Sequence, residues 1–428
     1  MPLRASRQLV LRAHSPAGFT LVELLVASTL GLVIMASLAS LFGLFSRSFS
    51  QSRDISDLAA QMRSAAWQLR RDLQGATADL SPWIRPESNA GYFELIEGPF
   101  TDTDAAAGTS NLRADVDDVL LFTTHSPRQP FVGRFFYRED LDLDNQLDPG
   151  EDTNGNNALD TFEQLESPYA EVAWFCKPSA NMIGTQPLYT LYRRQLLVVS
   201  QVGAADFAAS NSVPFVSWPA FYADKDLSCR REGATLVPNS LADLSKRECR
   251  FLHNLSGVVS GGSFPYEFPR TQVIGSSNNA IGEILDGNRN GEDVVLRNVL
   301  AFDVRAFDGS ATGVAAYVDL GVPSQGNGSL SSAVSLKSKL TVPTFDTWSM
   351  HYEFNGIDED ALHGVDQGTD GADLGGSSAN GAIDDESELE TAPPYSVALR
   401  GVEIRIRCVE PSSNEIRQIT IRHSFVGQ

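Results

Sequence analysis

The sequence predicts an α+β protein in which one long N-terminal helix packs on an antiparallel β-sheet domain with long loop insertions. Two patterns carry this prediction. An apolar run begins at residue 19 and passes into a helical pattern of apolar and polar residues that reaches residue 80. From residue 81 onward, runs rich in β-branched and aromatic residues alternate with polar stretches that contain glycine and serine. The 428-residue chain is 42% hydrophobic, which is enough to build a sizeable core.

Residues 19–45 form the apolar run, and Glu23 is the one charged residue in it. As a helix this stretch is about 40 Å long, enough to span a bilayer with some tilt. Arg4, Arg7 and Arg12 precede it without any acid, so the positive-inside rule leaves them in the cytoplasm and exports the rest. An ordinary signal peptide or a plain membrane anchor leaves Glu23 unexplained, because a carboxylate at bilayer depth costs about 2.5–3.5 kcal/mol.

Residues 46–80 are predicted to continue the helix outside the membrane. Apolar residues recur there at spacings of three and four, with arginines on the flanks, which is typical of a helix that buries one face. Gly75 and the Ser-Pro-Trp sequence at 81–83 are expected to end the helix. The predicted buried seam consists of Ile55, Leu58, Met62, Ala65, Leu69 and Leu73.

The start of the apolar run reads Gly-Phe-Thr-Leu-Val-Glu at residues 18–23. This stretch resembles the class III signal of type IV prepilins and type II secretion pseudopilins. The resemblance implies that residues 1–18 are a leader, and that a prepilin peptidase cuts between Gly18 and Phe19 and methylates the new amine. It also implies that Glu23, the fifth residue of the mature chain, faces the N-terminal ammonium of a neighbouring subunit. Such a cation would neutralise a buried carboxylate.

The remainder, residues 81–428, is predicted to form the β-rich domain. In the run at 397–409, apolar Val402, Ile404 and Ile406 alternate with charged residues, which suits an antiparallel sheet with one face in water. The Glu-Pro-Ser-Ser-Asn sequence that follows is a credible hairpin connection to the last run. The candidate strands cover residues 118–124, 131–137, 171–176, 188–199, 299–308, 397–409 and 415–425.

The order of these runs resembles the J-type minor pseudopilin of type II secretion, with the W-type minor pilin of type IV pili as a close relative. That resemblance implies a structural subunit at or near the tip of a pseudopilus that supports protein export. Its N-terminal helix would bind other pseudopilins or minor pilins. The same helix would anchor it in the bacterial inner membrane as a single-pass protein, with the C-terminal domain in the periplasm or on a surface fibre. A minor type IV pilin, or a calcium-dependent adhesin on a pilin anchor, remains as the alternative.

The chain is strongly acidic, with a net charge of −21, which argues against a nucleic-acid partner. Two segments, 139–163 and 353–390, together hold 21 acidic residues and no Lys or Arg, so the excess charge is local. They make up most of two predicted insertions, 139–165 and 353–391. Local acid of this kind indicates either a solvated loop or a cation site.

Residues 140–151 fit the twelve-residue calcium-loop template, whose ligands fall mainly at alternate positions, and residues 152–163 repeat it. Asn145 occupies the turn position, where the backbone must adopt a left-handed conformation. Neither loop has glycine there and no helices separate the loops, so a tandem resembling thrombospondin-type or dockerin-like repeats is favoured over an EF-hand. A solvated acidic loop remains the alternative, and segments 286–293 and 355–386 are left open. The predicted calcium ligands are Asp140, Asp142, Asp144, Gln146, Asp148, Glu151, Asp152, Asn154, Asn156, Asp160 and Glu163.

Four cysteines lie beyond the membrane segment, in a compartment that permits disulfides. Cys229 and Cys249 flank a polar stretch and would close a short loop. Cys176 and Cys408 both lie in strand-like runs and are candidates to pair across a sheet. Buried free thiols are the alternative for all four.

Catalytic motifs are not visible in the sequence. The six histidines are scattered, without a metalloprotease pair, and no nucleophile elbow, phosphate-binding loop or dinucleotide fingerprint occurs. Acidic loops without an apolar wall do not raise the pKa of one carboxylate selectively. We therefore expect neither enzyme activity nor a small-molecule substrate.

Overall fold

The computed structural model divides into two compact units, Met1–Asp57 and Leu58–Gln428, which are described separately. Helix α1, Leu21–Gln74, contributes residues to both units. The described residues are 18–81, 84–99, 115–135, 140, 142, 144–151, 159, 163–199, 218, 221–222, 225–232, 235–253, 264–270, 289, 291–310, 316–323, 328–332, 339–361, 364–373, 380–384 and 388–426.

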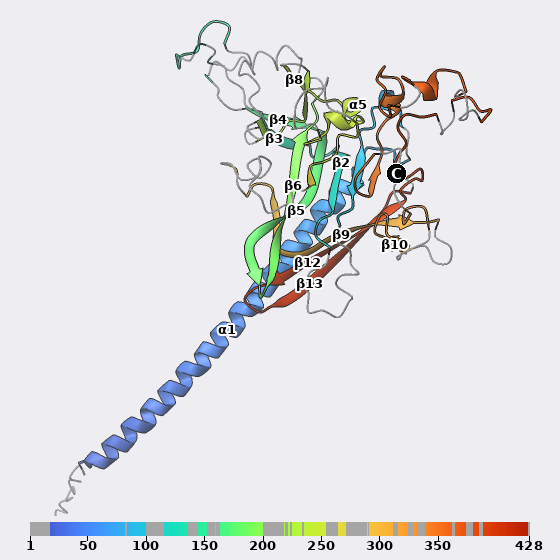
Figure 1. Ribbon diagram of the computed structural model, residues 1–428. Coiled ribbons are helices and arrows are strands. Elements are labelled where there is room, and N and C mark those ends of the chain that lie inside the picture. The colour runs from blue at the N-terminus through green and yellow to red at the C-terminus, as the bar shows by residue number, and fades with distance from the viewer. Residues whose placement is uncertain are drawn as a thin grey trace, which may run out of the picture. The chain divides into compact units, whose positions relative to one another are not determined.

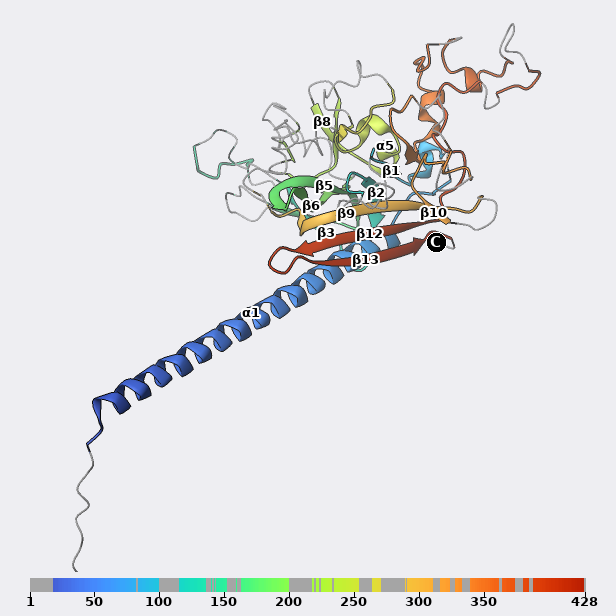
Figure 2. The same cartoon turned by 60° about the horizontal axis from the view of Figure 1, so that its bottom comes forward.

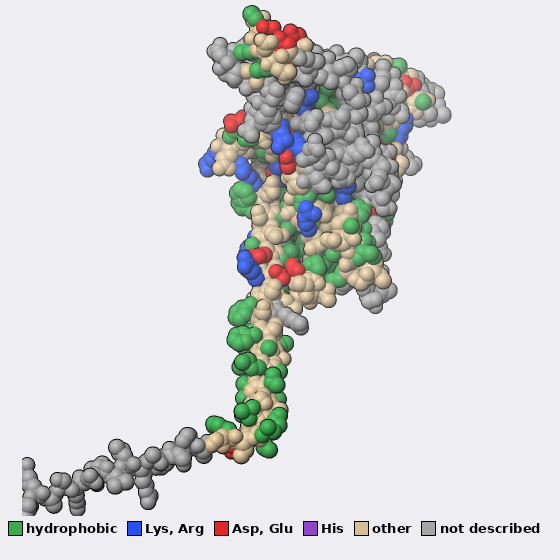
Figure 3. All heavy atoms as spheres, turned by 90° about the vertical axis from the view of Figure 1, so that its left-hand side faces the viewer, with side chains coloured by type: hydrophobic (Ala, Val, Ile, Leu, Met, Phe, Trp, Pro, Cys, Tyr) green, Lys and Arg blue, Asp and Glu red, His purple; other side chains and the backbone are tan. Residues whose placement is uncertain are grey.

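The first unit is helical over almost all of its described length. Every side chain from Leu21 to Phe45 is exposed, and Figure 3 shows hydrophobic groups around the helix there. Among the described residues, α1 is the one helix that is long and apolar enough to cross a membrane. Exposure of so much apolar surface fits the predicted membrane segment.

In the second unit, the rest of α1 packs into the main hydrophobic core. The predicted seam is confirmed from Leu58 onward, since Leu69 and Leu73 are fully buried. Ile55 belongs to the first unit and is half-buried. The helix ends at Gln74, earlier than the predicted residue 80. Gly75 follows it, and a Cβ there would lie 2.3 Å from the His125 carbonyl oxygen, so only glycine allows this close approach.

Nine strands form one antiparallel sheet in the order β11-β1-β2-β5-β6-β9-β12-β13, with β10 paired to β9. Figure 1 shows this sheet, and Figure 2 shows β9, β12 and β13 side by side at one edge. Two small sheets, β3–β4 and β7–β8, accompany it. The strands of the main sheet are β1 Phe93–Ile96, β2 Val119–His125, β5 Tyr169–Ile183, β6 Gln186–Leu197, β9 Val294–Asp308, β10 Ala316–Val318, β11 Thr344–Asp346, β12 Gly401–Glu410 and β13 Glu415–Ser424.

The remaining elements are short. Each lies in the second unit, between or beside the strands of the main sheet. They are β3 Phe131–Phe135, β4 Glu163–Ser167, β7 Cys229–Glu232, β8 Thr235–Pro238, α5 Leu241–Leu244, η1 Pro86–Ser88, η2 Arg247–Cys249, η4 Met350–Glu353 and η5 Gln367–Thr369.

The predicted α+β fold is confirmed, and each candidate strand corresponds to an observed one. The predicted closing hairpin is β12–β13, with Asn414 in the left-handed region at φ 56°. Residues 397–400 lie outside β12, which begins at Gly401. The alternation in β12 holds with one exception, because Glu403 is 1% exposed although it was expected to face water. Arg405 and Arg422 bind its two carboxylate oxygens, which makes the burial possible.

All four cysteines are buried free thiols, so the predicted disulfide pairs are absent from this structure. Cys176 lies in β5 and Cys408 in β12, and β6 and β9 separate these strands. Neighbouring strands lie about 4.8 Å apart, so three such steps exceed the separation that a disulfide permits. Cys229 and Cys249 are equally buried, and burial raises the pKa of both thiols, which keeps them protonated and weakly reactive.

Candidate processing and cation sites

Gly18 and Phe19, the predicted cleavage position, precede α1 directly. The Phe19 side chain is 85% exposed. A Cβ at Gly18 would meet no atom within 4 Å, so its own surroundings do not demand glycine. A requirement for glycine at position 18 would therefore come from another molecule that binds this segment, such as the predicted peptidase, and not from packing within the chain.

Glu23 belongs to a capping box at the start of α1. Its carboxylate accepts hydrogen bonds from the Thr20 backbone N–H at 3.0 Å and the Thr20 hydroxyl at 2.9 Å. The Glu23 N–H in turn donates to the Thr20 hydroxyl oxygen at 3.3 Å. The Thr-Leu-Val-Glu sequence carries the signal for this motif. The family resemblance predicted a partner for Glu23 in a neighbouring subunit and did not predict this contact. In a single chain, the partner of this carboxylate is Thr20.

The first predicted calcium loop brings its acids together. Oxygens of Asp140, Asp142 and Glu151 lie within 4.8 Å of one another. A second overlapping group unites Asp142, Asp144 and Asp148 in the same way. Asp140 and Glu151 are each 6% exposed, so the loop has a buried side.

The backbone of this loop follows the turn that the template requires. Asn145 has φ 60°, the left-handed conformation expected at the turn position. Its N–H donates to Asp140 at 3.1 Å, and the Asp144 N–H donates to both Asp140 and Asp142. The charge of Asp144, followed by desolvation and the other acids, raises the pKa of Asp148 above its ordinary value. The acids thus repel one another where they converge.

The structure gives less information about the other predicted calcium ligands. Asp152, Asn154, Asn156 and Asp160 lie outside the described residues. Glu163 is the first residue of β4, where its backbone pairs with Phe135. The Gln146 side chain donates to Asp144 at 3.2 Å, which leaves its backbone carbonyl as the expected ligand.

The described acids of segment 286–293 bind arginines. Glu292 lies 3.0 Å from Arg134 and 2.7 Å from Arg289, while Asp293 lies 3.0 Å from Arg194. Each of these carboxylates therefore has a cationic partner within the protein. Residues 286–288 and 290 of this segment lie outside the described residues.

In the segment 355–386, the described acids close turns. Asp366 accepts from the Gly356 N–H at 3.1 Å, Asp373 from the Gly381 N–H at 2.9 Å, and Asp384 from the Gly371 N–H at 2.8 Å. All three glycines have positive φ. The repeated Asn, Asp and Gly residues thus serve turn geometry here.

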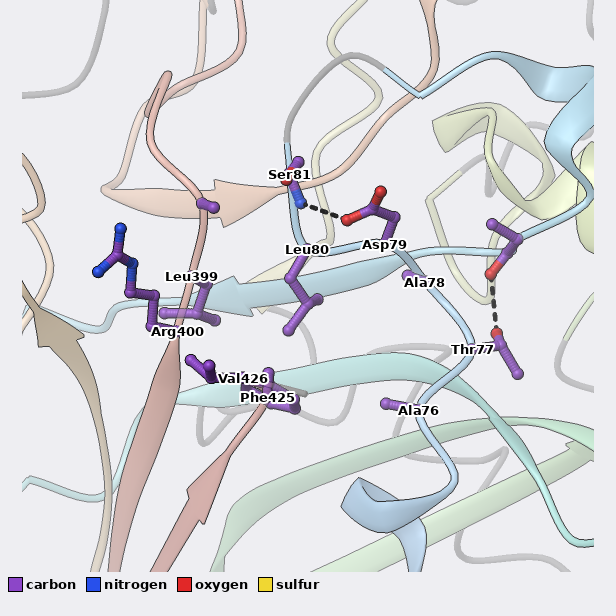
Figure 4. Close-up of a pocket in the computed structure, with 12 residues that line it drawn as sticks. Ala76, Thr77, Ala78, Asp79, Leu80, Ser81, Leu399, Arg400, Phe425 and Val426 are labelled. Carbon is purple, nitrogen blue, oxygen red and sulfur yellow. Dashed lines mark hydrogen bonds between the residues drawn. The ribbon is translucent and has the colours of Figure 1, made fainter. Parts of the chain in front are cut away.

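A cavity of about 500 Å³ lies beyond the end of α1 in the second unit (Figure 4). Leu80, Leu399 and Phe425 line its apolar side, and the Leu399 N–H donates to the Leu80 carbonyl at 3.0 Å. Asp79 bonds the Ser81 N–H at 3.1 Å.

One known protein family matches part of this chain. Residues 14–39 match the family described as the prokaryotic N-terminal methylation motif. The motif contains Gly18, Phe19 and Glu23 and indicates a type IV pilin-like or pseudopilin-like precursor, processed by a prepilin peptidase and assembled with other pilins. Together with the apolar part of α1, it fits membrane anchoring. No curated protein and no solved structure matches the chain.

Proposed function

We propose that this protein is a minor pseudopilin that is assembled at or near the tip of a type II secretion pseudopilus and supports protein export. The observation that carries the proposal is the methylation motif, with Glu23 in the first turn of a helix whose next residues are apolar and exposed. An exposed apolar helix of this kind gains a stable environment in a bilayer or among similar helices. The domain would be non-catalytic and would act through its contacts with other subunits or with cargo.

The size of the second unit supports a minor subunit. Leu58–Gln428 is a large body to repeat around every helix of a tightly packed fibre. At a fibre tip, the same domain meets fewer neighbours. The periplasm, or the surface of a fibre, is the compartment that the arginine-rich leader implies for it.

Calcium binding by the loop at 140–151 is part of this proposal. Five acids converge there, and oxygen ligands around a hard divalent cation remove their mutual repulsion. Sites in extracellular modules usually have a Kd of about 10⁻⁴–10⁻³ M, so this loop would be filled outside the cytoplasm. A calcium-dependent adhesin on a pilin anchor is the second candidate, and this loop is the observation that favours it.

Replacing Glu23 tests assembly. In the precursor or in an isolated subunit Glu23 bonds Thr20, and in a fibre the ammonium of a neighbouring Phe19 would replace that partner. Glu23→Val should insert into the membrane at least as well as the parent, because it removes a charge, but should fail to co-purify with fibre subunits. Asp57→Val is the matched control on the same helix, since Asp57 is 65% exposed and makes one weak pair with Arg53. Equal co-purification of both variants would refute the proposed pairing.

Deleting the gene for this protein in its host distinguishes the two candidate functions, pseudopilin and adhesin. Loss of protein export with normal surface attachment is expected for a pseudopilin. Loss of calcium-dependent attachment with normal export would instead identify an adhesin and would contradict the secretion role.

A further inference from the structure

Six buried acids gather where the ends of β1 and β2 meet β9. Each is at most 2% exposed, and they come from four separate segments of the chain. These acids lie outside the acid-rich insertions, so no pattern in the sequence predicted them. They are Glu97 after β1, Asp115, Asp117 and Asp118 before β2, Asp303 in β9 and Asp319 after β10.

Three of these acids, here called the outer acids, have arginine partners. Each pair joins a buried carboxylate to a guanidinium from another segment, so the charge is compensated within the protein. The pairs are Asp117–Arg270 at 3.2 Å, Asp303–Arg405 at 3.5 Å and Asp319–Arg305 at 3.0 Å.

The other three, here called the inner acids, are Glu97, Asp115 and Asp118. Among the residues that the structure describes, no Lys, Arg or His forms an ion pair with them. Backbone N–H groups hold them instead: Leu320 donates to Glu97 at 3.0 Å, and Gly98 donates to Asp118 at 3.1 Å. The inner acids thus carry three carboxylates into the core without a cation.

Two oxygens of the inner acids have no hydrogen-bond partner among the described atoms. They are Oε1 of Glu97 and Oδ2 of Asp115, on side chains that are 1% and 0% exposed. A buried carboxylate oxygen without a partner is costly, and native proteins rarely leave one unsatisfied. This observation is independent of the clustering and points to a ligand at the inner acids.

The inner acids also have the right spacing for a cation. Each offers one oxygen, and these three oxygens lie within 4.8 Å of one another. Two ligands of one calcium ion, at about 2.4 Å each, lie at most ~4.8 Å apart. We propose that Glu97, Asp115 and Asp118 bind a divalent cation of the calcium class in the core of the second unit.

The charges favour occupation of this site by a cation. Three carboxylates that form no ion pair with a described Lys, Arg or His lie together in the core, and desolvation disfavours each of their charges. Ionised inner acids therefore destabilise the fold unless a cation balances them. Calcium tolerates irregular oxygen ligands and gives up its water readily, whereas magnesium retains several waters and demands an octahedron. Because the inner acids lie in a closed interior, calcium is favoured over magnesium at this site.

The ion would join distant parts of the sheet. Asp118 already accepts from the Val304 N–H in β9 at 2.6 Å, and the Phe302 N–H donates to the Asp115 carbonyl at 2.8 Å. Glu97 adds the end of β1 to the same point. A cation there crosslinks β1, the start of β2 and the middle of β9, so its role is structural and is separate from the loop at 140–151.

The test uses the full-length protein in detergent, in a background that lacks the exposed loop site. Asp142→Asn with Asp144→Asn provides that background. After equilibration with micromolar calcium and removal of free metal, we expect one calcium ion per chain by elemental analysis. We also expect a melting midpoint ~5 °C higher than with chelator when free calcium is ~100 times Kd. Equal midpoints and no bound metal in this background would overturn the proposal.

Glu97→Gln with Asp115→Asn, added to the background, should abolish the bound calcium and its thermal shift. The matched control is Glu353→Gln, which changes an equally buried acid whose oxygens are satisfied by Thr391 and Glu390. It should keep the ion. If the inner variant still binds one ion per chain, the ion is not held by the inner acids. If the inner variant is more stable than the background protein, and calcium changes the melting midpoint of neither protein, the inner acids hold protons rather than metal. Either result overturns the proposal, and the background measurement decides the matter if the inner variant does not fold.

Discussion

Asp72 near the end of α1 is expected to be one of the most sensitive positions in the second unit. Its carboxylate accepts two hydrogen bonds from Arg193, at 2.7 and 2.9 Å, and one from the Trp174 indole at 3.0 Å. Asp72 is 2% exposed and Arg193 is 9% exposed, so water cannot replace these contacts. The pair connects the helix to β5 and β6.

Asp72→Ala leaves a buried guanidinium and a buried indole N–H without their partner. Removing one member of a buried ion pair costs about 3–5 kcal/mol, and the better helix propensity of alanine returns only about 0.5 kcal/mol. The free energy of unfolding should therefore fall by about 3–4 kcal/mol. Urea denaturation of the full chain in detergent, followed by tryptophan fluorescence, measures this loss.

Asp57→Ala is the control for that experiment. Asp57 and Arg53 lie 3.9 Å apart and are 65% and 84% exposed, so their pair contributes less than about 1 kcal/mol. Adding Arg193→Met to Asp72→Ala should recover part of the loss, because it removes the uncompensated charge. Equal losses for Asp72→Ala and Asp57→Ala, or strict additivity with Arg193→Met, would refute the reasoning.

Three further outcomes are expected. Gly18→Val should leave an uncut precursor in the membrane, which mass spectrometry of the N-terminus detects; a chain that still begins at Phe19 would contradict it. Burial opposes the charged form of Glu403, but hydrogen bonds and charge from Arg422 and Arg405 outweigh it and hold its pKa below the ordinary value. Glu403→Gln should therefore cost stability near neutral pH, and the difference from the parent should shrink as pH falls below about 4.3 in urea titrations. Asp142→Ala with Asp144→Ala should remove one of two calcium ions per chain, and unchanged stoichiometry would leave that loop as solvated acid.

The helix and the long strands were predictable because their patterns are local. The seam from Leu58 to Leu73 and the alternation of Val402, Ile404 and Ile406 both follow from side-chain periodicity and burial. Strand β1 was missed, since it is short and its register depends on partners far along the chain. The helix ends at Gln74, directly before Gly75, one of the two predicted stop signals, although the predicted helical region extended to residue 80.

The candidate sites show the same difference between local patterns, which the sequence predicts, and tertiary contacts, which it does not. The processing motif and the loop at 140–151 are contiguous in sequence, so a family resemblance predicted the first and the spacing of the acids predicted the second. The left-handed conformation of Asn145 is confirmed, whereas calcium binding stays a prediction. The inner acids Glu97, Asp115 and Asp118 become neighbours only after β1 and β2 pair. Asp115 and Asp118 resemble ordinary loop residues in the sequence. The capping role of Glu23 was available from the Thr-x-x-Glu pattern but was overlooked.

The contacts of α1 and of the sheet join residues that are synthesised at very different times. Asp72 is separated from Arg193 by 121 residues, and the N–H of Phe93 bonds Thr347 across 254 residues. At about 5–20 residues per second, the helix waits roughly 6–24 s for Arg193 to be synthesised and longer for the far edge of the sheet. In the export that we propose, the apolar seam from Leu58 to Leu73 leaves the translocation channel during that time, before the strands that cover it are complete. Periplasmic holdase chaperones, or the bilayer surface itself, would have to shield this seam, so the yield of folded subunit should depend on them more than its final stability does.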